Sequence, residues 1–210
     1  VYPTRNLIDA VGSLGLRPKT LVCASAVGYY GDRGEELLDE NSPAGSGFLA
    51  DVCKSWEHEA ARGRDMGMRV VSVRIGVVFG KNGGALKKML TPFKLGVGGV
   101  LGNGKQWMPW IHIDDLVNML LFAAEHAELE GPINGVAPEP ATNREFTKTL
   151  AATLHRPAIF PVPEFAVRLA FGEVADVLLA SQRVAPKVGQ ELGFEYRFGR
   201  LGEALKDVVG

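Results

Sequence analysis

The chain has 210 residues, of which 46% are hydrophobic and 22% are charged, and its formal net charge at pH 7 is −1. This composition is typical of a globular protein with one sizeable core. Acidic and basic residues are interspersed, so we expect neither a nucleic-acid partner nor binding to an anionic membrane. The apolar runs are shorter than the roughly 20 residues that a membrane-spanning helix needs.

The first third of the chain reads as alternating helices and strands. Residues 4–14 carry apolar side chains at helical spacing, and residues 20–24 form a short apolar run typical of a strand buried on both faces of a parallel sheet. A polar loop follows at 30–47. The pattern then predicts a helix over 48–66 and a Val-rich strand over 68–75.

The remainder continues the alternation and then becomes helix-rich. Thr142 and Glu145 have the spacing of a capping box, which predicts a helix start at residue 143. The further elements that the pattern predicts are helices over 85–95, 114–126 and 143–154, a glycine-rich connection over 96–104, a strand over 132–136, and helical segments over 165–171, 174–181 and 201–208.

Helix followed by strand, repeated with short connections, indicates an α/β fold with a parallel sheet. A doubly wound sheet has about six strands and a glycine-rich phosphate-binding turn, whereas this sequence has three central strands and no such turn. We interpret the chain as the C-terminal part of a Rossmann-like doubly wound parallel sheet, with about 80 preceding residues outside it. The alternative is a complete domain with a reduced sheet, which would leave strand 20–24 with an open edge.

Four segments carry a resemblance to a known family. Residues 25–31 (SAVGYYG), 74–80 (RIGVVFG), 110–116 (WIHIDDL) and 133–136 (INGV) together resemble the extended short-chain dehydrogenase/reductase superfamily. Within it the chain is similar to the atypical NAD-dependent epimerase/dehydratase-like branch, whose members have a small C-terminal lobe. The resemblance implies a partial NAD(P)-binding Rossmann-like domain over 1–158 and a small helix-rich substrate lobe over 159–210.

Members of this superfamily transfer a hydride with the help of a Tyr, a Lys and a Ser or Thr hydroxyl. The Lys and the hydroxyl are needed because a phenol is a poor base unless a cation and a hydrogen bond stabilise its anion. The hydroxyl normally stands four residues before the Tyr of a Tyr-Gly pair. Here Ala26 holds that position before Tyr30, and Ser25 is one place away.

The Tyr-x-x-x-Lys pair is absent from the helix over 48–66. Alignment on Lys54 puts Ala50 at the Tyr position, whereas alignment on the Trp-Glu pair at 56–57 puts Leu49 and Cys53 at the two positions. Ser25, Tyr29 and Tyr30 therefore remain as candidate catalytic residues. The alternative for both tyrosines is a packed ring with a structural hydrogen bond.

The resemblance implies NADP or NAD as cofactor, with the main binding motif absent from this chain. The candidate cofactor contacts are Ala24 and Ser25 at a strand end, and the main chain of Gly76 and Val77. Since main-chain contacts constrain side chains weakly, the signal from the last two is of low specificity.

On the substrate side, the resemblance suggests contacts from Gln106, Trp107, Trp110 and His112. A single His is more often structural, and we keep that alternative for His112. Cys23 and Cys53 have the spacing of neither a zinc site nor a disulfide framework, so we predict no metal site and two reduced thiols in a cytoplasmic protein.

Two functions remain open. The first is an NAD(P)-binding epimerase/dehydratase-like oxidoreductase with a small-molecule substrate, working without the usual Tyr-Lys pair. The second is a non-catalytic dinucleotide-binding sensor or scaffold, which the altered trio favours. The resemblance also implies a homodimer through helices 4–14 and 48–66, although their apolar stripes have equal reason to pack on the sheet.

Overall fold

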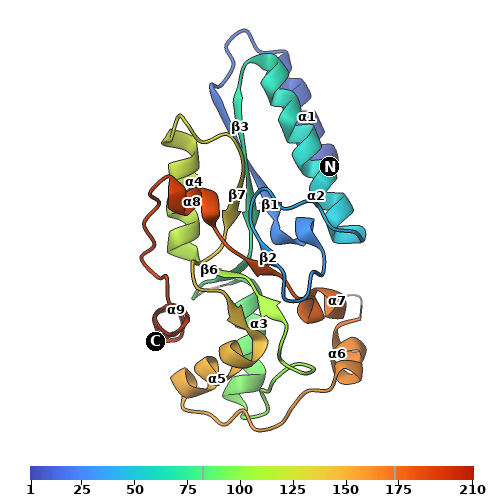
Figure 1. Cartoon of the computed structure of the whole chain (residues 1–210), viewed down its shortest axis with the longest axis vertical. Helices are drawn as coiled ribbons and strands as arrows, with labels where there is room; N and C mark the ends of the chain where they lie inside the picture. Colours follow the sequence, from blue (N-terminus) through green and yellow to red (C-terminus); the bar gives the residue numbers. More distant parts are fainter. Residues whose placement is uncertain (82, 173) are drawn as a thin grey trace.

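The computed structural model describes residues 1–81, 83–172 and 174–210. Its centre is a three-stranded parallel sheet in the order β1–β3–β7 (Figure 1). The strands are β1 (Thr20–Ala26), β3 (Arg69–Ile75) and β7 (Gly131–Gly135). The predicted α/β fold with a parallel sheet is therefore confirmed.

Helices cover both faces of this sheet, with α1 and α2 on one side and α4 and α8 on the other (Figure 1). These helices are α1 (Tyr2–Gly12), α2 (Phe48–Ala61) with its 3-10 continuation η2 (Arg62–Met66), α4 (Ile113–Glu125) and α8 (Lys187–Glu191). Gly67, at φ +80°, ends η2 and turns the chain into β3. Glycine adopts this left-handed conformation without a Cβ clash.

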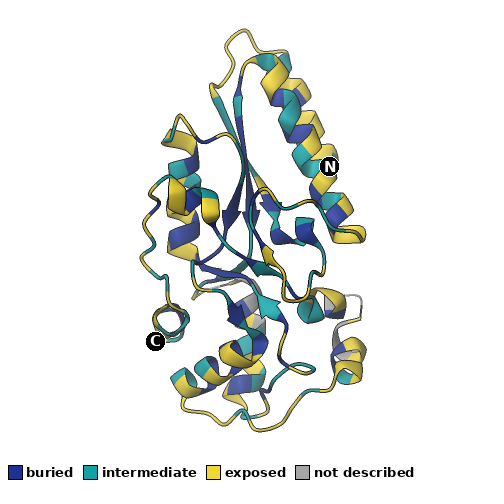
Figure 2. Cartoon of the chain, in the orientation of Figure 1, coloured by how far each residue is buried: buried dark blue, intermediate teal, exposed yellow. Residues whose placement is uncertain are grey.

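The two outer strands differ in burial from the central one. All five inner residues of β3 are buried, because it pairs with a strand on each side (Figure 2). β1 is mostly half-buried, and Ala24 is exposed. Our prediction that this strand is buried on both faces was wrong, because no described strand pairs with its second edge.

A second core lies beyond the carboxyl end of the sheet and is built from short strand pairs and helices. Phe79, Trp110 and Phe146 are fully buried within it. The elements of this region are 3-10 helix η1 (Val27–Tyr30), strands β2 (Leu37–Leu38), β4 (Val77–Phe79), β5 (Trp107–Met108), β6 (Trp110–His112), β8 (Ala141–Thr142) and β9 (Arg183–Val184), and helices α3 (Gly84–Lys94), α5 (Asn143–Leu154), α6 (Glu164–Phe171), α7 (Val174–Leu179) and α9 (Leu201–Val209).

The capping box at the start of α5 is confirmed. The Thr142 hydroxyl accepts a hydrogen bond from the Glu145 amide, and the Glu145 carboxylate accepts one from the Thr142 amide at 2.7 Å. The tail does not gather in one place: α6 packs on α7, α8 on β7 and α9 on α5. The domain boundary at 158/159 stays a prediction.

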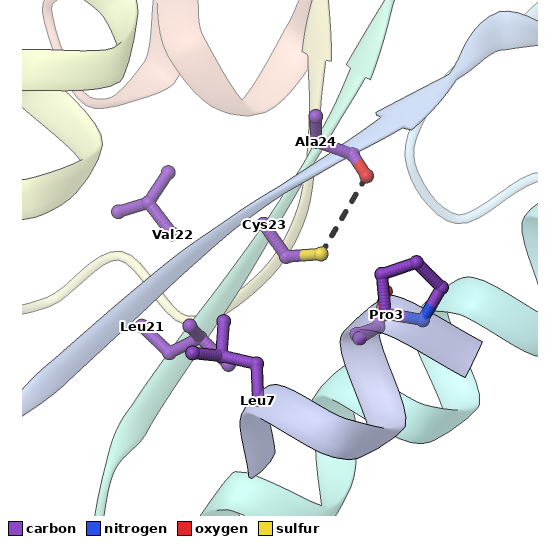
Figure 3. A pocket seen from close by; sticks show the side chains of 7 residues that line it. Pro3, Leu7, Leu21, Val22, Cys23 and Ala24 are labelled. Atoms are coloured by element: carbon purple, nitrogen blue, oxygen red, sulfur yellow. Dashed lines mark hydrogen bonds between the residues drawn. The ribbon is translucent and has the colours of Figure 1, made fainter. Parts of the chain in front are cut away.

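A small apolar hollow of about 260 Å³ lies between α1 and the free edge of β1. Figure 3 shows Pro3 and Leu7 of α1 opposite the β1 residues, with the Cys23 thiol between them. Burial raises the pKa of this thiol, so it stays protonated at neutral pH. Across the described residues, no helix is both long and apolar enough to cross a bilayer.

An ion-pair network ties α1 to α2. Glu59 accepts a hydrogen bond from Arg5 Nε at 2.9 Å and pairs with Arg62 at the same distance. Arg62 in turn pairs with Asp9 at 2.7 Å. The hydrogen bonds from Arg5 and Arg62 lower the pKa of the Glu59 carboxyl to about 2.

We expect Glu59→Gln to destabilise the protein at neutral pH and to lose this effect in acid. The folded pKa lies below the ordinary value of 4.5, so the carboxylate stabilises the fold above that pH and the stabilisation is lost as the pH falls towards 2. Urea unfolding at a series of pH values measures the difference. Glu195→Gln, at an exposed position, is the matched control. A constant gap between Glu59→Gln and the unmodified protein at every pH would contradict the prediction.

Candidate functional site

A row of polar side chains crosses the carboxyl half of the sheet. Ser25 on β1 stands beside Arg74 on β3, and Arg74 stands beside Asn134 on β7. All three are buried. Polar groups in such a position need partners, because an unpaired buried donor or acceptor costs about 1–3 kcal/mol. The partners come from α2 and from the loop that follows β1.

Glu57 of α2 supplies the charge that balances Arg74. Its carboxylate accepts hydrogen bonds from Arg74 Nε and Nη2, both at 2.9 Å, and from the Ser25 hydroxyl at 2.7 Å. Burial alone would lower the pKa of Arg74, but the hydrogen bonds with Glu57 and Tyr30 raise it above its ordinary value. Arg74 and Glu57 form a buried ion pair, and the Ser25 hydroxyl is hydrogen-bonded to its carboxylate. Arg74 therefore has a structural role as one partner of this pair.

Tyr30 completes the network on the other side of Arg74. Its hydroxyl donates to Asn134 Oδ1 at 2.7 Å and accepts from Arg74 Nη1 at 3.0 Å. Burial raises the pKa of Tyr30 to about 12. The side chain is completely inaccessible, so contact with a substrate would require the site to open. This geometry does not support the predicted catalytic role and favours the structural alternative.

Tyr29 differs from its neighbour in both burial and bonding. It is half-buried, and the Arg74 guanidinium lies 3.5 Å from the centre of its ring. Among the described residues its hydroxyl makes no hydrogen bond to protein. Of the two candidate tyrosines, Tyr29 is therefore the one with an uncommitted hydroxyl and a cation against its ring.

A second buried carboxyl lies behind this network. Glu40 Oε1 accepts from the main-chain N–H of Asn134 at 2.9 Å, whereas Oε2 is buried and has no hydrogen-bond partner among the described residues. Burial raises the pKa of Glu40. The main-chain oxygen of Glu40 also accepts from Arg74 at 3.3 Å, which fixes the loop after β2 to the sheet.

The structure distinguishes the two alignments of the missing Tyr-Lys pair. A Cβ placed on Gly28 would meet Leu49 Cβ at 3.3 Å and Cys53 Sγ at 3.9 Å, so both side chains face η1. Lys54 instead pairs with Asp51 at 2.6 Å on the exposed side of α2. The geometry favours Leu49 and Cys53 as the replacements. Burial raises the pKa of the Cys53 thiol. A thiol is neutral or anionic and never a cation, so Cys53 does not supply the positive charge of the missing Lys.

The candidate cofactor contacts lie at the same end of the sheet. Ala24 is exposed, whereas Ser25 points into the protein and is only 5% exposed. The amide of Gly76 donates to Gly135 and that of Val77 donates to Pro109. A Cβ on Gly76 would lie 2.7 Å from the Pro109 oxygen, so glycine is required by close packing. Both amides are used within the protein and are not free to hold a carboxamide.

The four candidate substrate contacts separate into two groups. Trp110 is 1% exposed and stacks on Phe79 with ring centres 5.4 Å apart. His112 is equally buried and caps α4 by accepting from the Asp114 amide at 3.2 Å. Both side chains are buried, and their placement favours the structural alternative for His112 and does not support substrate contact.

Gln106 lines an open hollow of about 310 Å³, and Trp107 is its neighbour in the chain. Trp107 Nε1 donates to Glu35 at 2.8 Å, and the Arg183 guanidinium lies 4.7 Å from the ring centre. Three segments meet at the hollow: the loop after η1, the loop before β5, and α6 with the end of α7. Its polar lining includes Asp32, Glu35, Lys105, Gln106, Glu164 and Ser181.

Glu57, the central carboxylate of this network, was not predicted to be a functional residue. It was used only, together with Trp56, to align the helix over 48–66 with the family's Tyr-x-x-x-Lys pattern. A signal was present in the sequence, because Glu57 follows Cys53 by four residues and so lies on the same face of a helix. A charged side chain there, combined with an Arg inside a Val-rich strand, predicts a buried pair. Among the described residues no group of His, Cys, Asp and Glu is arranged to hold a metal ion.

Comparison with known proteins agrees with this fold. The model of the NAD dependent epimerase/dehydratase family matches residues 2–134, and a model described as a domain of unknown function matches residues 162–208. A crystal structure of the human epimerase family protein SDR39U1 with NADPH has a TM-score of 0.94 and 41% identity, covering 99% of this chain and 70% of that one. A UDP-glucose 4-epimerase from Thermus thermophilus, at 21% identity and TM-score 0.77, shares the fold.

The relatives are longer than this chain. The Arabidopsis thaliana SDR39U1 homolog, named as chloroplastic, is 45% identical over 208 residues, which are 98% of this chain and 60% of the relative. The Bacillus subtilis protein YfhF is 40% identical, with 100% and 69% covered. With a family match over more than half of its residues, this chain belongs to the NAD dependent epimerase/dehydratase family.

Proposed function

We propose that this chain forms the nicotinamide and substrate side of an NAD(P)-dependent oxidoreductase of the epimerase/dehydratase type, acting on a small molecule. The observation that carries the proposal is the pairing of Tyr29 with Arg74 at the carboxyl end of a parallel sheet. In open α/β sheets, ligands bind at this end of the strands. The human relative whose structure has NADPH supports the choice of cofactor.

Bound NAD(P) would accept or supply the hydride, and the chain must handle the proton. Tyr29 is the candidate for this step, because its hydroxyl is uncommitted and Tyr30 is locked between Asn134 and Arg74. Arg74 holds a fixed positive charge against the Tyr29 ring, close to where negative charge develops when a phenol gives up its proton. Glu57 holds the Arg74 guanidinium in place, and this role leaves its carboxylate unable to move with a substrate.

The test is to mix the full-length natural gene product with NADPH or NADH and a panel of sugar-derived aldehydes and ketones, and to follow cofactor oxidation by absorbance. We expect oxidation that depends on at least one member of the panel and on protein concentration. If the cofactor binds in calorimetry but is never oxidised, the result would favour the second candidate, a sensor or scaffold. The apolar replacements Leu49 and Cys53 support that candidate. No binding of either cofactor would contradict both.

Two further properties of the whole protein belong to this proposal. We propose a cytoplasmic location, which fractionation of the source cells tests. The Arabidopsis relative, by contrast, is named chloroplastic.

We also propose a homodimer through α1 and α2. Leu7 and Phe48 on these helices are 53% and 79% exposed, which leaves apolar surface for a partner copy. Sedimentation of the protein at several concentrations measures the dimer.

A further inference from the structure

We infer that Arg183 of β9 and the Trp107 indole of β5 form a binding site for a small molecule that carries a single carboxylate, and that the site disfavours a doubly charged phosphate. The inference goes beyond the proposed function, which leaves the charge of the small molecule open. It concerns binding alone and does not depend on oxidoreductase activity.

The positive charge of Arg183 has no counter-ion in the described part of the chain. No carboxylate among the described residues lies within 4.0 Å of its guanidinium. Its Nε is buried and has no hydrogen-bond partner among those residues. A buried donor without an acceptor is costly, above all in a charged group. Both the charge and this donor are therefore left to be satisfied by a group from outside the described chain.

The contact with Trp107 does not supply the missing acceptor. The Arg183 guanidinium lies 4.7 Å from the centre of the indole ring. Such a cation–π contact attracts the positive charge to the ring face, whereas the five N–H donors of an arginine need oxygen acceptors in the plane of the guanidinium. The indole therefore positions the guanidinium and leaves its hydrogen bonds to a ligand.

The Trp107 ring and the chain next to Arg183 are both held by hydrogen bonds. The indole Nε1 donates to Glu35 Oε2 at 2.8 Å, and the Trp107 main-chain N–H donates to Ser181 Oγ at 3.1 Å. The Trp107 main-chain oxygen accepts from the N–H of Gln182, the residue before Arg183, at 3.1 Å. The binding groups are thus in place before a ligand arrives, which lowers the entropy that binding costs.

The pairing of β9 with β2 puts Arg183 on an outer face. Leu37 pairs with Arg183, and Leu38 pairs with Val184. Leu38 and Val184 are completely buried in one core cluster. Because neighbouring side chains of a strand point to opposite faces, Arg183 and the 57% exposed Leu37 share the face turned away from that core. A molecule from solvent can therefore approach this face.

Glu35 decides between a singly and a doubly charged ligand. Its carboxylate binds the edge of the Trp107 indole, and the Arg183 guanidinium lies over the same ring system. A ligand carboxylate balances one guanidinium, whereas a phosphate monoester carries a charge of about −1.5 to −2 at pH 7 and meets repulsion from Glu35. A planar carboxylate also matches the planar donor fork of arginine. Charge and shape therefore favour a carboxylic acid.

Three probes that share one sugar frame test the charge class. Glucuronate has a carboxylate at the sixth carbon, glucose a hydroxyl, and glucose 6-phosphate a phosphate. Each is added at neutral pH and constant ionic strength, without cofactor, to the full-length natural gene product. The readout is the NMR signal of the Trp107 indole N–H, assigned with the variant Trp107→Phe. The Trp110 indole, which donates to the Glu139 oxygen at 3.2 Å in the second core, is the internal control.

We expect glucuronate to shift the Trp107 signal in a saturable manner and glucose to leave it in place. Glucose 6-phosphate should bind about two- to fivefold more weakly than glucuronate, the effect of one partly exposed like charge. The Trp110 signal stays unchanged with all three probes.

Substitutions of Arg183 test the residue itself. Arg183→Gln removes the charge and should weaken glucuronate binding about tenfold or more, as expected for hydrogen bonds to a charged group. Arg183→Lys keeps the charge without the planar fork and should cause a smaller loss. Arg200→Gln, at an exposed position before α9, makes the same charge change and should leave binding unaltered. An unchanged Trp110 signal shows that each variant is folded.

Glu35→Gln tests the opposite sign. The amide that replaces the carboxylate still has an oxygen for the Trp107 indole but carries no charge. We expect glucuronate to bind about two- to fivefold more tightly, and glucose 6-phosphate to gain more than glucuronate because it carries more charge.

The inference is overturned if glucuronate does not move the Trp107 signal, if glucose 6-phosphate binds as tightly as glucuronate, or if Arg183→Gln binds glucuronate as well as the unmodified protein does. The measurement uses no cofactor and no turnover. Failure of glucuronate binding therefore leaves NADPH oxidation to be tested separately, and failure of the oxidation assay leaves the carboxylate site intact.

Discussion

Replacing Glu57 by Gln is expected to lower the free energy of unfolding by about 3–5 kcal/mol, the typical cost of breaking a buried ion pair from one side. The Arg74 side chain is 4% exposed, so its charge remains buried when the carboxylate is lost. Ser25 also loses a charged acceptor at 2.7 Å. Urea unfolding, followed by far-ultraviolet circular dichroism, measures the loss.

A double substitution separates the ion pair from simple packing. Arg74→Met combined with Glu57→Met removes both charges, and we expect it to cost less than the sum of the two single changes. Strict additivity would show that the two residues are not coupled. Stability of Glu57→Gln within about 0.5 kcal/mol of the unmodified protein would contradict a buried pair that stabilises the fold.

Replacing Tyr29 by Phe is expected to lower turnover about 10²–10⁴-fold, the usual contribution of a positioned acid or base, in the reaction that the carbonyl panel identifies. The hydroxyl makes no hydrogen bond to the described protein, so the change should leave stability within about 0.5 kcal/mol. The ring and its contact with the Arg74 guanidinium are kept. The readout is the rate of cofactor oxidation per folded molecule.

Tyr30→Phe is the matched control, with the opposite expected pattern. Its hydroxyl bonds Asn134 and Arg74 in the core, so its removal should cost about 1–3 kcal/mol of stability. Turnover per folded molecule should remain. An unchanged rate in Tyr29→Phe would eliminate Tyr29 as the proton-transfer residue, and a lost rate in Tyr30→Phe at full stability would reverse the two roles.

The candidate site was only partly predictable. The motif at residues 25–31 predicted a candidate site at the end of a strand, because a strand followed by a Gly-containing turn is a local signal. It could not decide between Tyr29 and Tyr30, which are neighbours in the same 3-10 helix. Their burial differs because Tyr30 faces Asn134, 104 residues away, whereas Tyr29 lies on the outer side of the guanidinium.

The sequence by itself determined the order of the longer helices and of the three central strands, the parallel sheet, the capped start of α5 and the family. Each of these depends on periodicity or short motifs, which act within about one helical turn or one strand. Only the tertiary structure decided that Glu57 balances Arg74, that Trp110 and His112 are core residues, and that Glu164 and Asp32 line the same hollow. Those facts depend on contacts between distant segments, whose register is set by how α2, α4 and the tail pack on the sheet.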